Sequence, residues 1–309
     1  MSIEIEVIHN QAYVENLGEV LARPEELMEV PSFRVASYNV HNLFGDRPDV
    51  HSSRPDPPSS PEQLKALAKM IIDLDADAIA FQEVQNERVL SDLIRKRVNP
   101  KLGKAARFTT FICIPAKDPR GINVALATRF AVNGTMNFNA REFGPLEERA
   151  KKFSRDLLGV DMYATPSFRF LFFVAHLKSK LGGEESESKR RLEAGEIREI
   201  IEKPTFGGQP FIQQDMLLAG DMNDDPDKTT IAILRGSAPM LLSDVLAEVN
   251  PNYTYPTHTR YPKTRLDYMF ASPSMKITAV NIHRENEAAA EASDHYPVSA
   301  TIKVPRRRG

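Results

Sequence analysis

An apolar, strand-like run that stops at two hard-oxygen side chains constrains this chain more than any other feature. Residues 217–219 (Leu-Leu-Ala) lead into Gly220, and the chain then presents Asp221 and Asn223. In an extended backbone, residues i and i+2 point to the same side, so the carboxylate and the amide would enter one pocket. Such a pair suits a hard divalent cation or a water molecule that the cation activates. The alternative is a turn in which these side chains hydrogen-bond their own backbone.

Four further segments share this design, in which a strand-like run adjoins a functional side chain. The functional groups are Asn39 after residues 33–38, Glu83 after residues 78–82, His176 after residues 170–175, and the pair Asp294 and His295 just before another strand-like run. Functional groups of open sheets gather at strand ends, because a rigid scaffold holds the loops there. Together the five segments supply a carboxylate ligand, an acid–histidine pair and a second histidine. This set is the one that metal-assisted hydrolysis needs.

The ordered motifs resemble those of the endonuclease/exonuclease/phosphatase superfamily, in a bacterial or phage nuclease-like form. The matching segments are residues 37–40 (SYNV), 81–84 (FQEV), 174–179 (VAHLKS), 220–224 (GDMND), 265–270 (RLDYMF) and 293–297 (SDHYP). They follow the family's order, and the ordered set is specific although each piece alone is not. The resemblance implies a deoxyribonuclease I-like α/β fold, a four-layer sandwich of two packed mixed β-sheets flanked by helices.

The resemblance also implies the metal site and the general base. Glu83 would be the principal ligand of Mg²⁺, with Mn²⁺ as a possible substitute. Asn39 would be a second ligand or a neighbour that positions Glu83. His295 would be the general base, and Asp294 would act in its network or at the metal. Which acid contacts which histidine is left open by the sequence.

Roles for the remaining motif residues follow from the same resemblance. His176 would donate to the scissile phosphate or stabilise its developing charge. Asp221 would orient or deprotonate the attacking water, and Asn223 would bind a phosphate oxygen. Asp267 lies near the same site and would support Asn223 or a second metal. The histidines that match no motif are expected to be structural or exposed, and they are His9, His41, His51, His258 and His283.

Basic residues in or beside the motif loops are the candidates for gripping phosphates. The formal net charge is −2, so a polyanion would have to be held by a local basic patch. Arginine side chains match phosphate oxygens well. The candidates are Arg120, Arg155, Lys178, Lys180, Arg190, Arg191 and Arg265, with Asp267 grouped beside them. For Arg190 and Arg191 the alternative is the solvated face of a helix.

One catalytic domain is expected over residues 32–305, between an N-terminal extension (1–31) and a basic tail (306–309). The 309 residues are 41% hydrophobic and 27% charged, which is ordinary for a soluble globular protein. The single cysteine, Cys113, excludes an internal disulfide framework. The acidic start lacks a secretory signal, and no apolar run approaches the ~20 residues that span a bilayer. A cytoplasmic protein without membrane contact is therefore expected.

Apolar runs that alternate with amphipathic stretches predict interleaved strands and helices. The predicted strands are residues 33–39, 78–82, 107–114, 122–128, 168–175, 216–220, 266–271 and 297–303. Helices are predicted from Pro61 to about residue 74 and over residues 87–98, 184–203 and 228–235. Residues 131–160 carry no clear pattern, apart from residues 153–157 (FSRDL), which resemble a segment of bacterial family members.

These features predict a Mg²⁺-dependent phosphodiester hydrolase and favour a DNA endonuclease or nickase, in which water attacks phosphorus in line. A phosphomonoesterase or small-molecule phosphodiesterase on the same fold is the first alternative, because it would use the same residues. A non-catalytic nucleic-acid-binding module is the second, and the retained motif residues disfavour it. The active-site tyrosine of exonuclease III-like repair enzymes has no clear equivalent here, and tryptophan is absent. The oligomeric state is not set by the sequence.

Overall fold

The computed structural model describes residues 30–47, 53, 57–116, 118–144, 152–203, 208–258 and 260–305. The expected N-terminal extension therefore lies almost entirely outside the described residues, and the basic tail lies wholly outside them. Among the described residues, none of the helices has the length and apolar character needed to cross a membrane.

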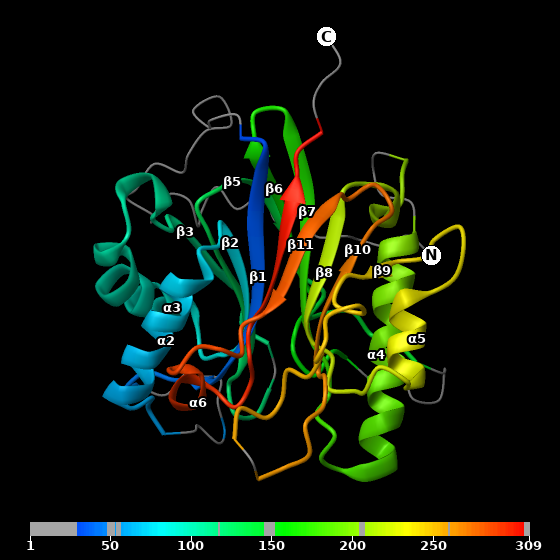
Figure 1. Ribbon diagram of the computed structural model, residues 1–309. Helices are drawn as coiled ribbons and strands as arrows, with labels where there is room; N and C mark the ends of the chain where they lie inside the picture. The colour runs from blue at the N-terminus through cyan, green and yellow to red at the C-terminus, as the bar shows by residue number, and fades with distance from the viewer. Residues whose placement is uncertain are drawn as a thin grey trace.

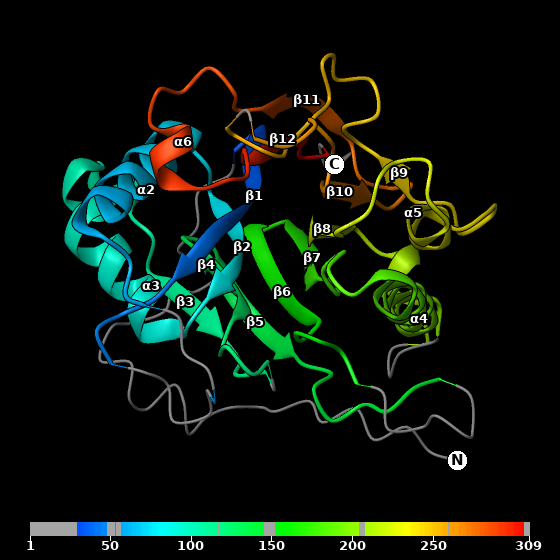
Figure 2. The same cartoon turned by 90° about the horizontal axis from the view of Figure 1, so that it is seen from below.

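Two six-stranded mixed sheets pack face to face, and helices cover the outer face of each (Figures 1 and 2). In spatial order, sheet A contains β11 (Ile277–Ile282), β12 (Val298–Lys303), β1 (Ser32–Leu43), β2 (Ala78–Val84), β4 (Asn123–Thr128) and β3 (Thr110–Cys113). Sheet B contains β5 (Ala131–Met136), β6 (Leu158–Thr165), β7 (Phe168–His176), β8 (Met216–Asp221), β10 (Asp267–Ala271) and β9 (Ser243–Asp244). The predicted four-layer sandwich is confirmed.

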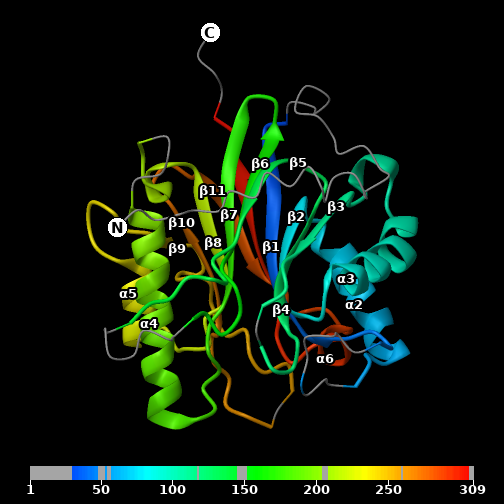
Figure 3. The ribbon, with the colours of Figure 1, turned by 180° about the vertical axis from the view of Figure 1, so that it is seen from behind.

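The helical layers lie on opposite sides of the sandwich, as the view from behind also shows (Figure 3). Beside sheet A lie α2 (Pro61–Leu74), α3 (Glu87–Leu93) and the short α6 (Ala289–Ala292). Beside sheet B lie α4 (Gly183–Glu202) and α5 (Thr229–Arg235). In the described part of the chain, the other helical turns are a π-helix (Ile94–Val98) and 3-10 helices at Asn99–Lys101, Lys104–Ala106 and Phe211–Gln213.

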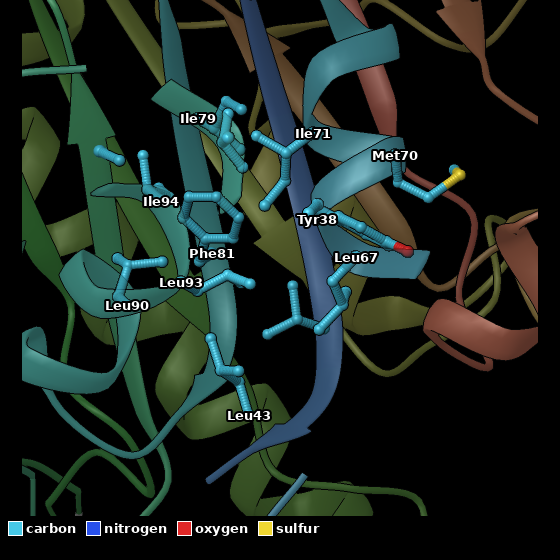
Figure 4. Packing of buried hydrophobic residues seen from close by; sticks show 14 of the residues in the cluster. Tyr38, Leu43, Leu67, Met70, Ile71, Ile79, Phe81, Leu90, Leu93 and Ile94 are labelled. Atoms are coloured by element: carbon cyan, nitrogen blue, oxygen red, sulfur yellow. The ribbon is translucent and has the colours of Figure 1, made fainter. Parts of the chain in front are cut away.

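Burial on both faces explains why the strands read as continuous apolar runs. Along β7, Phe172 and Val174 belong to the core between the sheets, whereas Leu171 and Phe173 belong to the core under α4. Alternate residues of a strand point to opposite faces, so a strand covered on both sides needs apolar residues at every position. Figure 4 shows the equivalent packing under α2, where Phe81 of β2 lies among helix side chains.

The helix starts are largely as predicted. Ser60 caps α2 by accepting a hydrogen bond from the Gln63 N–H, and Pro61 occupies the first turn, where its missing N–H costs nothing. The helix predicted over residues 87–98 is α-helical only to Leu93 and continues as the π-helix.

Strands β5, β6, β9 and β11 were not predicted, and β6 shows why. Gly159 and Asp161 interrupt its apolar pattern. A Cβ at Gly159 would lie 2.8 Å from the Phe173 ring, so the glycine makes room for that ring. Asp161 pairs with Arg169 of β7, a partner that local pattern does not reveal.

Two parallel strand pairs determine where the site lies. β1 runs parallel to β2 in sheet A, and β7 runs parallel to β8 in sheet B. β12 is antiparallel to β1, and β10 is antiparallel to β8. The ends of the four parallel strands and the starts of the two antiparallel ones therefore meet at one edge of the sandwich. This is the lower edge in Figure 1 and the end facing the viewer in Figure 2.

Candidate active site

Asp221, at the end of β8, is the centre of the cluster of functional side chains. Its neighbours in register are His176 of β7 and Asp267 of β10. Its Oδ2 accepts a hydrogen bond from Asn39 Nδ2 at 3.0 Å, and it lies 3.5 Å from His176 Nε2 and 3.8 Å from His295 Nε2. All five side chains are buried. The structure thus brings together predicted residues from both sheets around one carboxylate.

Asp267 is the acid that holds His295. Its Oδ2 lies 2.8 Å from His295 Nδ1, which leaves Nε2 facing Asp221. Asp294, the neighbour in sequence, instead has its Oδ1 3.9 Å from His41 Nδ1. Among the described residues, the side-chain contact of Asp267 is with this imidazole, and its support of Asn223 or of a second metal stays a prediction.

Two residues outside the predicted set hold this pair in place. The Ser293 hydroxyl donates to the Asn39 carbonyl and accepts from the His295 N–H, so it joins the turn before β12 to the end of β1. The Thr254 hydroxyl accepts from the Asp267 N–H at the start of β10. Ser293 opens the motif at residues 293–297, which is the signal that could have found it, whereas no sequence signal distinguishes Thr254.

Asn223 adopts a left-handed backbone with φ of 53°, not the extended form that the i, i+2 argument assumed. Its N–H donates to Asp221 Oδ1 at 2.8 Å, which is the turn considered as the alternative. Its amide Nδ2 donates to the Leu177 carbonyl at 3.1 Å. The segment is therefore both a turn and part of the site, because Asp221 Oδ2 still faces the two histidines.

The other half of the site lies at the ends of β1 and β2. The pairing of these strands shifts register between Asn39 and Leu43, and the backbone is left-handed at His41, Asn42 and Glu83. Bulges and positive φ values of this kind re-aim side chains and gather at functional sites. Glu83 is only partly buried, and its Oε2 accepts a hydrogen bond from the Asn42 N–H at 3.1 Å.

The donor set here fits a hard divalent cation with few protein ligands. No group of three or more His, Cys, Asp or Glu side chains in the described part of the chain is arranged to hold a metal. Mg²⁺ usually keeps several waters and takes one or two carboxylates, so a single acid is compatible with it. Glu83 offers that carboxylate, and Asn39 Oδ1, which accepts from the His41 N–H, offers an amide oxygen. Asp294 is partly exposed beside His41 and completes the predicted set.

The two histidines occupy opposite electrostatic environments. Burial lowers the pKa of His295, but Asp267 and Asp221 more than compensate and raise it to about 10. Burial, Arg155 and His295 hold the pKa of His176 well below its usual value. Burial raises the pKa of Asp221 to about 7, against the opposing charge of His295. The two acids therefore favour the protonated form of His295, whereas burial and nearby positive charge favour the neutral form of His176.

Three of the predicted phosphate-binding arginines are buried inside the protein. Arg155 Nη1 donates to the Leu177 carbonyl at 3.1 Å, and its Nε lies 3.2 Å from an Asp118 carboxylate oxygen. Arg190 donates to the Ser179 carbonyl at 3.1 Å and lies 3.4 Å from Asp224. Both arginines therefore tether the loop after His176.

Arg265 is the third buried arginine. It pairs with both oxygens of Asp244, at 3.1 and 2.6 Å, and lies over the Tyr268 ring. Arg191 pairs with Glu187 on the more exposed face of α4, at 3.2 Å, as the solvated-helix alternative predicts.

The remaining basic candidates are more exposed than the three buried arginines. Arg120 Nη1 is 3.5 Å from Asn42 Oδ1 and adds positive charge near His176. Lys180 pairs with Asp225 at 2.5 Å. The Lys178 side chain is partly exposed, and its backbone N–H donates to the buried Glu193. Arg120 and Lys178 are thus partly exposed, unlike the three buried arginines.

The chain belongs to the Endonuclease/Exonuclease/phosphatase family, whose sequence profile matches residues 36–295. Members of this family are generally hydrolases of phosphoesters that depend on divalent metals. No curated protein matches the chain in a sequence search.

Solved structures share the fold at low sequence identity. The human nocturnin catalytic domain with bound sulfate is 17% identical, with a TM-score of 0.62 over 88% of this chain and 93% of that one. The mannosyl-6-phosphatase of Bacteroides thetaiotaomicron is 20% identical, with a TM-score of 0.61 over 88% and 100%. A humanized D. rerio TDP2 is 16% identical, with a TM-score of 0.62 over 89% and 100%.

Proposed function

We propose that this protein is a Mg²⁺-dependent phosphodiesterase that cleaves DNA as an endonuclease or nickase, with Mn²⁺ as a possible substitute. One observation carries the proposal. Asn39, Asp221, His295 and Asp267 form a continuous chain of polar contacts, which begins on the same strand pair that ends in Glu83. A proton-transfer network and a hard-oxygen ligand set therefore lie side by side, as metal-assisted hydrolysis requires.

The buried network supplies the proton chemistry. Water attacks phosphorus in line, and its proton passes to the carboxylate of Asp221, whose Oδ2 lies 3.8 Å from His295 Nε2. Asp267 holds the other imidazole nitrogen and so fixes the orientation of the ring. His176, whose neutral form is favoured and whose Nε2 lies 3.5 Å from Asp221, would donate to a phosphate oxygen.

Glu83 and Asn39, with Asp294 nearby, would hold the divalent cation. A bound cation would neutralise charge on the phosphate oxygens and on the departing oxygen. Arg120 and Lys178 would add positive charge at the opening, where the phosphates of a longer substrate would lie.

A phosphomonoesterase or small-molecule phosphodiesterase is the second candidate, and one specific observation favours it. Arg155, Arg190 and Arg265 are each about 95% buried and are committed to protein partners, so fewer basic residues can grip a polyanion than the sequence indicates. The similarity to a mannosyl-6-phosphatase structure also agrees with this alternative.

A supercoiled-plasmid nicking assay beside a phosphate-release panel tests the proposal. The panel contains sugar phosphates and mononucleotides, and both assays are run with Mg²⁺, Mn²⁺ and EDTA. The proposal predicts that the wild type nicks the plasmid when Mg²⁺ or Mn²⁺ is present and that EDTA abolishes this activity. The Glu83→Gln variant should not nick the plasmid. Release of inorganic phosphate from the panel, without nicking by the same preparation, would overturn the nuclease assignment in favour of the second candidate.

A further inference from the structure

An aromatic surface lies beside the candidate active site, in the loop between β9 and β10. Tyr255 and Tyr261 are stacked there, with ring centroids 6.5 Å apart and planes inclined by 16°. Arg260 lies over the Tyr261 ring at 5.5 Å. Tyr261 is 47% exposed and is one of three large hydrophobic residues exposed in the described part of the chain. Tyr261 is therefore an aromatic residue that is both held by neighbouring side chains and about half exposed to solvent.

Backbone contacts hold this pair of tyrosines, here called the tyrosine platform, in a fixed position. Tyr255 and Thr264 form an antiparallel bridge, with N–H···O distances of 3.0 and 2.7 Å. The Thr257 N–H donates to the Asp294 carbonyl at 2.9 Å, so the loop is tied to the turn that carries His295. The Tyr255 ring centroid lies 5.0 Å from that of His295. The platform thus extends outward directly from the proton-transfer network.

The charge of this loop suits a polyanionic ligand. Between Glu248 and Asp267 the sequence contains no acidic residue. The same stretch contains Arg260 and Lys263, and both side chains are exposed at the surface of the loop. Interleaved aromatic and basic side chains are typical of surfaces on which nucleobases stack while cations meet the phosphates.

We propose that Tyr255 and Tyr261 form a stacking site for an unpaired nucleobase of the strand being cut, next to the scissile phosphate. The proposal rests on the proposed nuclease function and extends it, because it names single-stranded or locally unpaired nucleic acid as the preferred substrate. Stacking needs an aromatic face close to the reacting phosphate. Tyr255 stacks against the Tyr261 ring and Arg260 lies over it, so a base would take the place of Arg260, whose guanidinium would then meet a phosphate. A base in duplex DNA would first have to leave its own stack to use it.

Binding of a single strand tests the proposal without any turnover. The probe is an oligothymidine with 2-aminopurine at alternate positions and a terminal fluorescein, in EDTA at low salt. Anisotropy of the fluorescein reports binding, and quenching of 2-aminopurine reports stacking. Tyr261→Ala should weaken binding roughly 5- to 150-fold, equivalent to ~1–3 kcal/mol per stacked base, and should relieve most of the quenching. Tyr261→Phe should retain both signals because it keeps the ring.

Leu241→Ala, which shortens another exposed apolar side chain away from the motif loops, is the matched control and should behave as wild type. Binding by the wild type with quenching that Tyr261→Ala leaves unchanged would overturn the platform alone. If the wild type gave no anisotropy change with single-stranded or duplex DNA, the nuclease proposal would fail as well. Binding of duplex but not of single strands would overturn the platform and leave the nuclease proposal standing.

Discussion

The two halves of the site differ in how completely the protein satisfies their polar groups. On sheet B, Asp221 is 2% exposed, accepts hydrogen bonds from Asn39 and from the Asn223 N–H, and faces two histidines. On sheet A, the partly exposed carboxylate of Glu83 accepts one hydrogen bond from the described residues, from the Asn42 N–H.

This difference indicates which half of the site has its polar groups satisfied by the protein alone and which half leaves them available to a ligand. A buried carboxylate surrounded by partners has a fixed geometry and a shifted pKa, which suit proton transfer. An open carboxylate on strained backbone leaves its oxygens available to a ligand. We infer that proton transfer is preorganised by the fold, whereas the metal half is completed only when the cation binds. The predictions below separate the two halves.

Glu83→Gln should have the largest effect. Without the charged ligand, hydrolysis should fall roughly 10⁴-fold at low Mg²⁺, because a bound cation supplies several kcal/mol of charge stabilisation. Glu87→Gln, the same chemical change at the start of α3, is the control and should retain activity. Initial rates across a Mg²⁺ titration provide the measurement, and wild-type turnover by Glu83→Gln at low Mg²⁺ would remove it from the metal site.

His295→Ala should follow, with a loss of ~10²- to 10⁴-fold, the usual range for removal of a proton-transfer group. His283, which hydrogen-bonds Ser299 at 2.8 Å on sheet A, is the matched histidine outside the site. His283→Ala should change the rate little in the same steady-state assay. Equal losses in two folded variants would contradict the assignment of His295.

Asp267→Asn should act through His295, with a smaller loss of roughly 10- to 100-fold. The variant removes a negative charge 2.8 Å from His295 Nδ1, so the pKa of His295, about 10 in the wild type, should fall. An NMR titration of the imidazole measures this shift directly. An unchanged pKa would show that Asp267 has no electrostatic role at His295, whatever happens to the rate.

Asp156 extends the comparison to a buried carboxylate outside the site. Its Oδ1 accepts from the Phe138 N–H, its Oδ2 has no partner among the described residues, and burial raises its pKa to about 8. Between about pH 4 and the folded pKa, the folded protein keeps this proton and the unfolded chain releases it. Stability should therefore fall as pH rises through this window, by at most ~1.4 kcal/mol per pH unit from this group.

Asp156→Asn removes that contribution. Urea unfolding at several pH values should show the wild type losing stability relative to the variant from about pH 5 to the folded pKa, with no further divergence above it. The two proteins are compared by how their free energy of unfolding changes with pH. Their absolute stabilities are not compared, because the asparagine of the variant also introduces a buried N–H donor. Parallel stability curves for the two proteins would mean that Asp156 titrates normally in the folded state.

The smallest expected effects concern phosphate contacts. Lys178→Ala should flatten the dependence of log DNA affinity on log salt by about 0.9, the value for one lost phosphate contact on duplex DNA. Arg191→Ala should leave the slope unchanged, because Arg191 pairs with Glu187 on the helix face. A salt titration of DNA binding in EDTA measures the slope for both variants. A larger change of slope in Arg191→Ala than in Lys178→Ala would show that Arg191, and not Lys178, contacts phosphate.

The sequence predicts the strand ends well because each motif is local. Glu83, His176 and Asp221 each lie at or next to a strand end that the apolar run before it reveals, whereas β1 continues past Asn39 to Leu43. The contact between Asp267 and His295 joins residues 28 apart and depends on β10 pairing with β8, which no local pattern encodes.

Burial of the arginines was equally out of reach of the sequence. Whether Arg190 faces a substrate or the protein is decided by Asp224, 34 residues away, on the loop after β8. The sequence shows the positive charge but not the buried carboxylate that neutralises it. Basic residues in motif loops therefore overstated the surface that can hold phosphates.

A Mn²⁺-binding titration tests the division of the site most directly, since it needs no substrate. Electron paramagnetic resonance of free Mn²⁺ gives the dissociation constant for the wild type, Glu83→Gln and His295→Ala. The account predicts that Glu83→Gln weakens Mn²⁺ binding by at least ~100-fold, whereas His295→Ala binds within a few-fold of the wild type. Wild-type affinity in Glu83→Gln, together with lost binding in His295→Ala, would place the cation in the sheet B half and contradict the account.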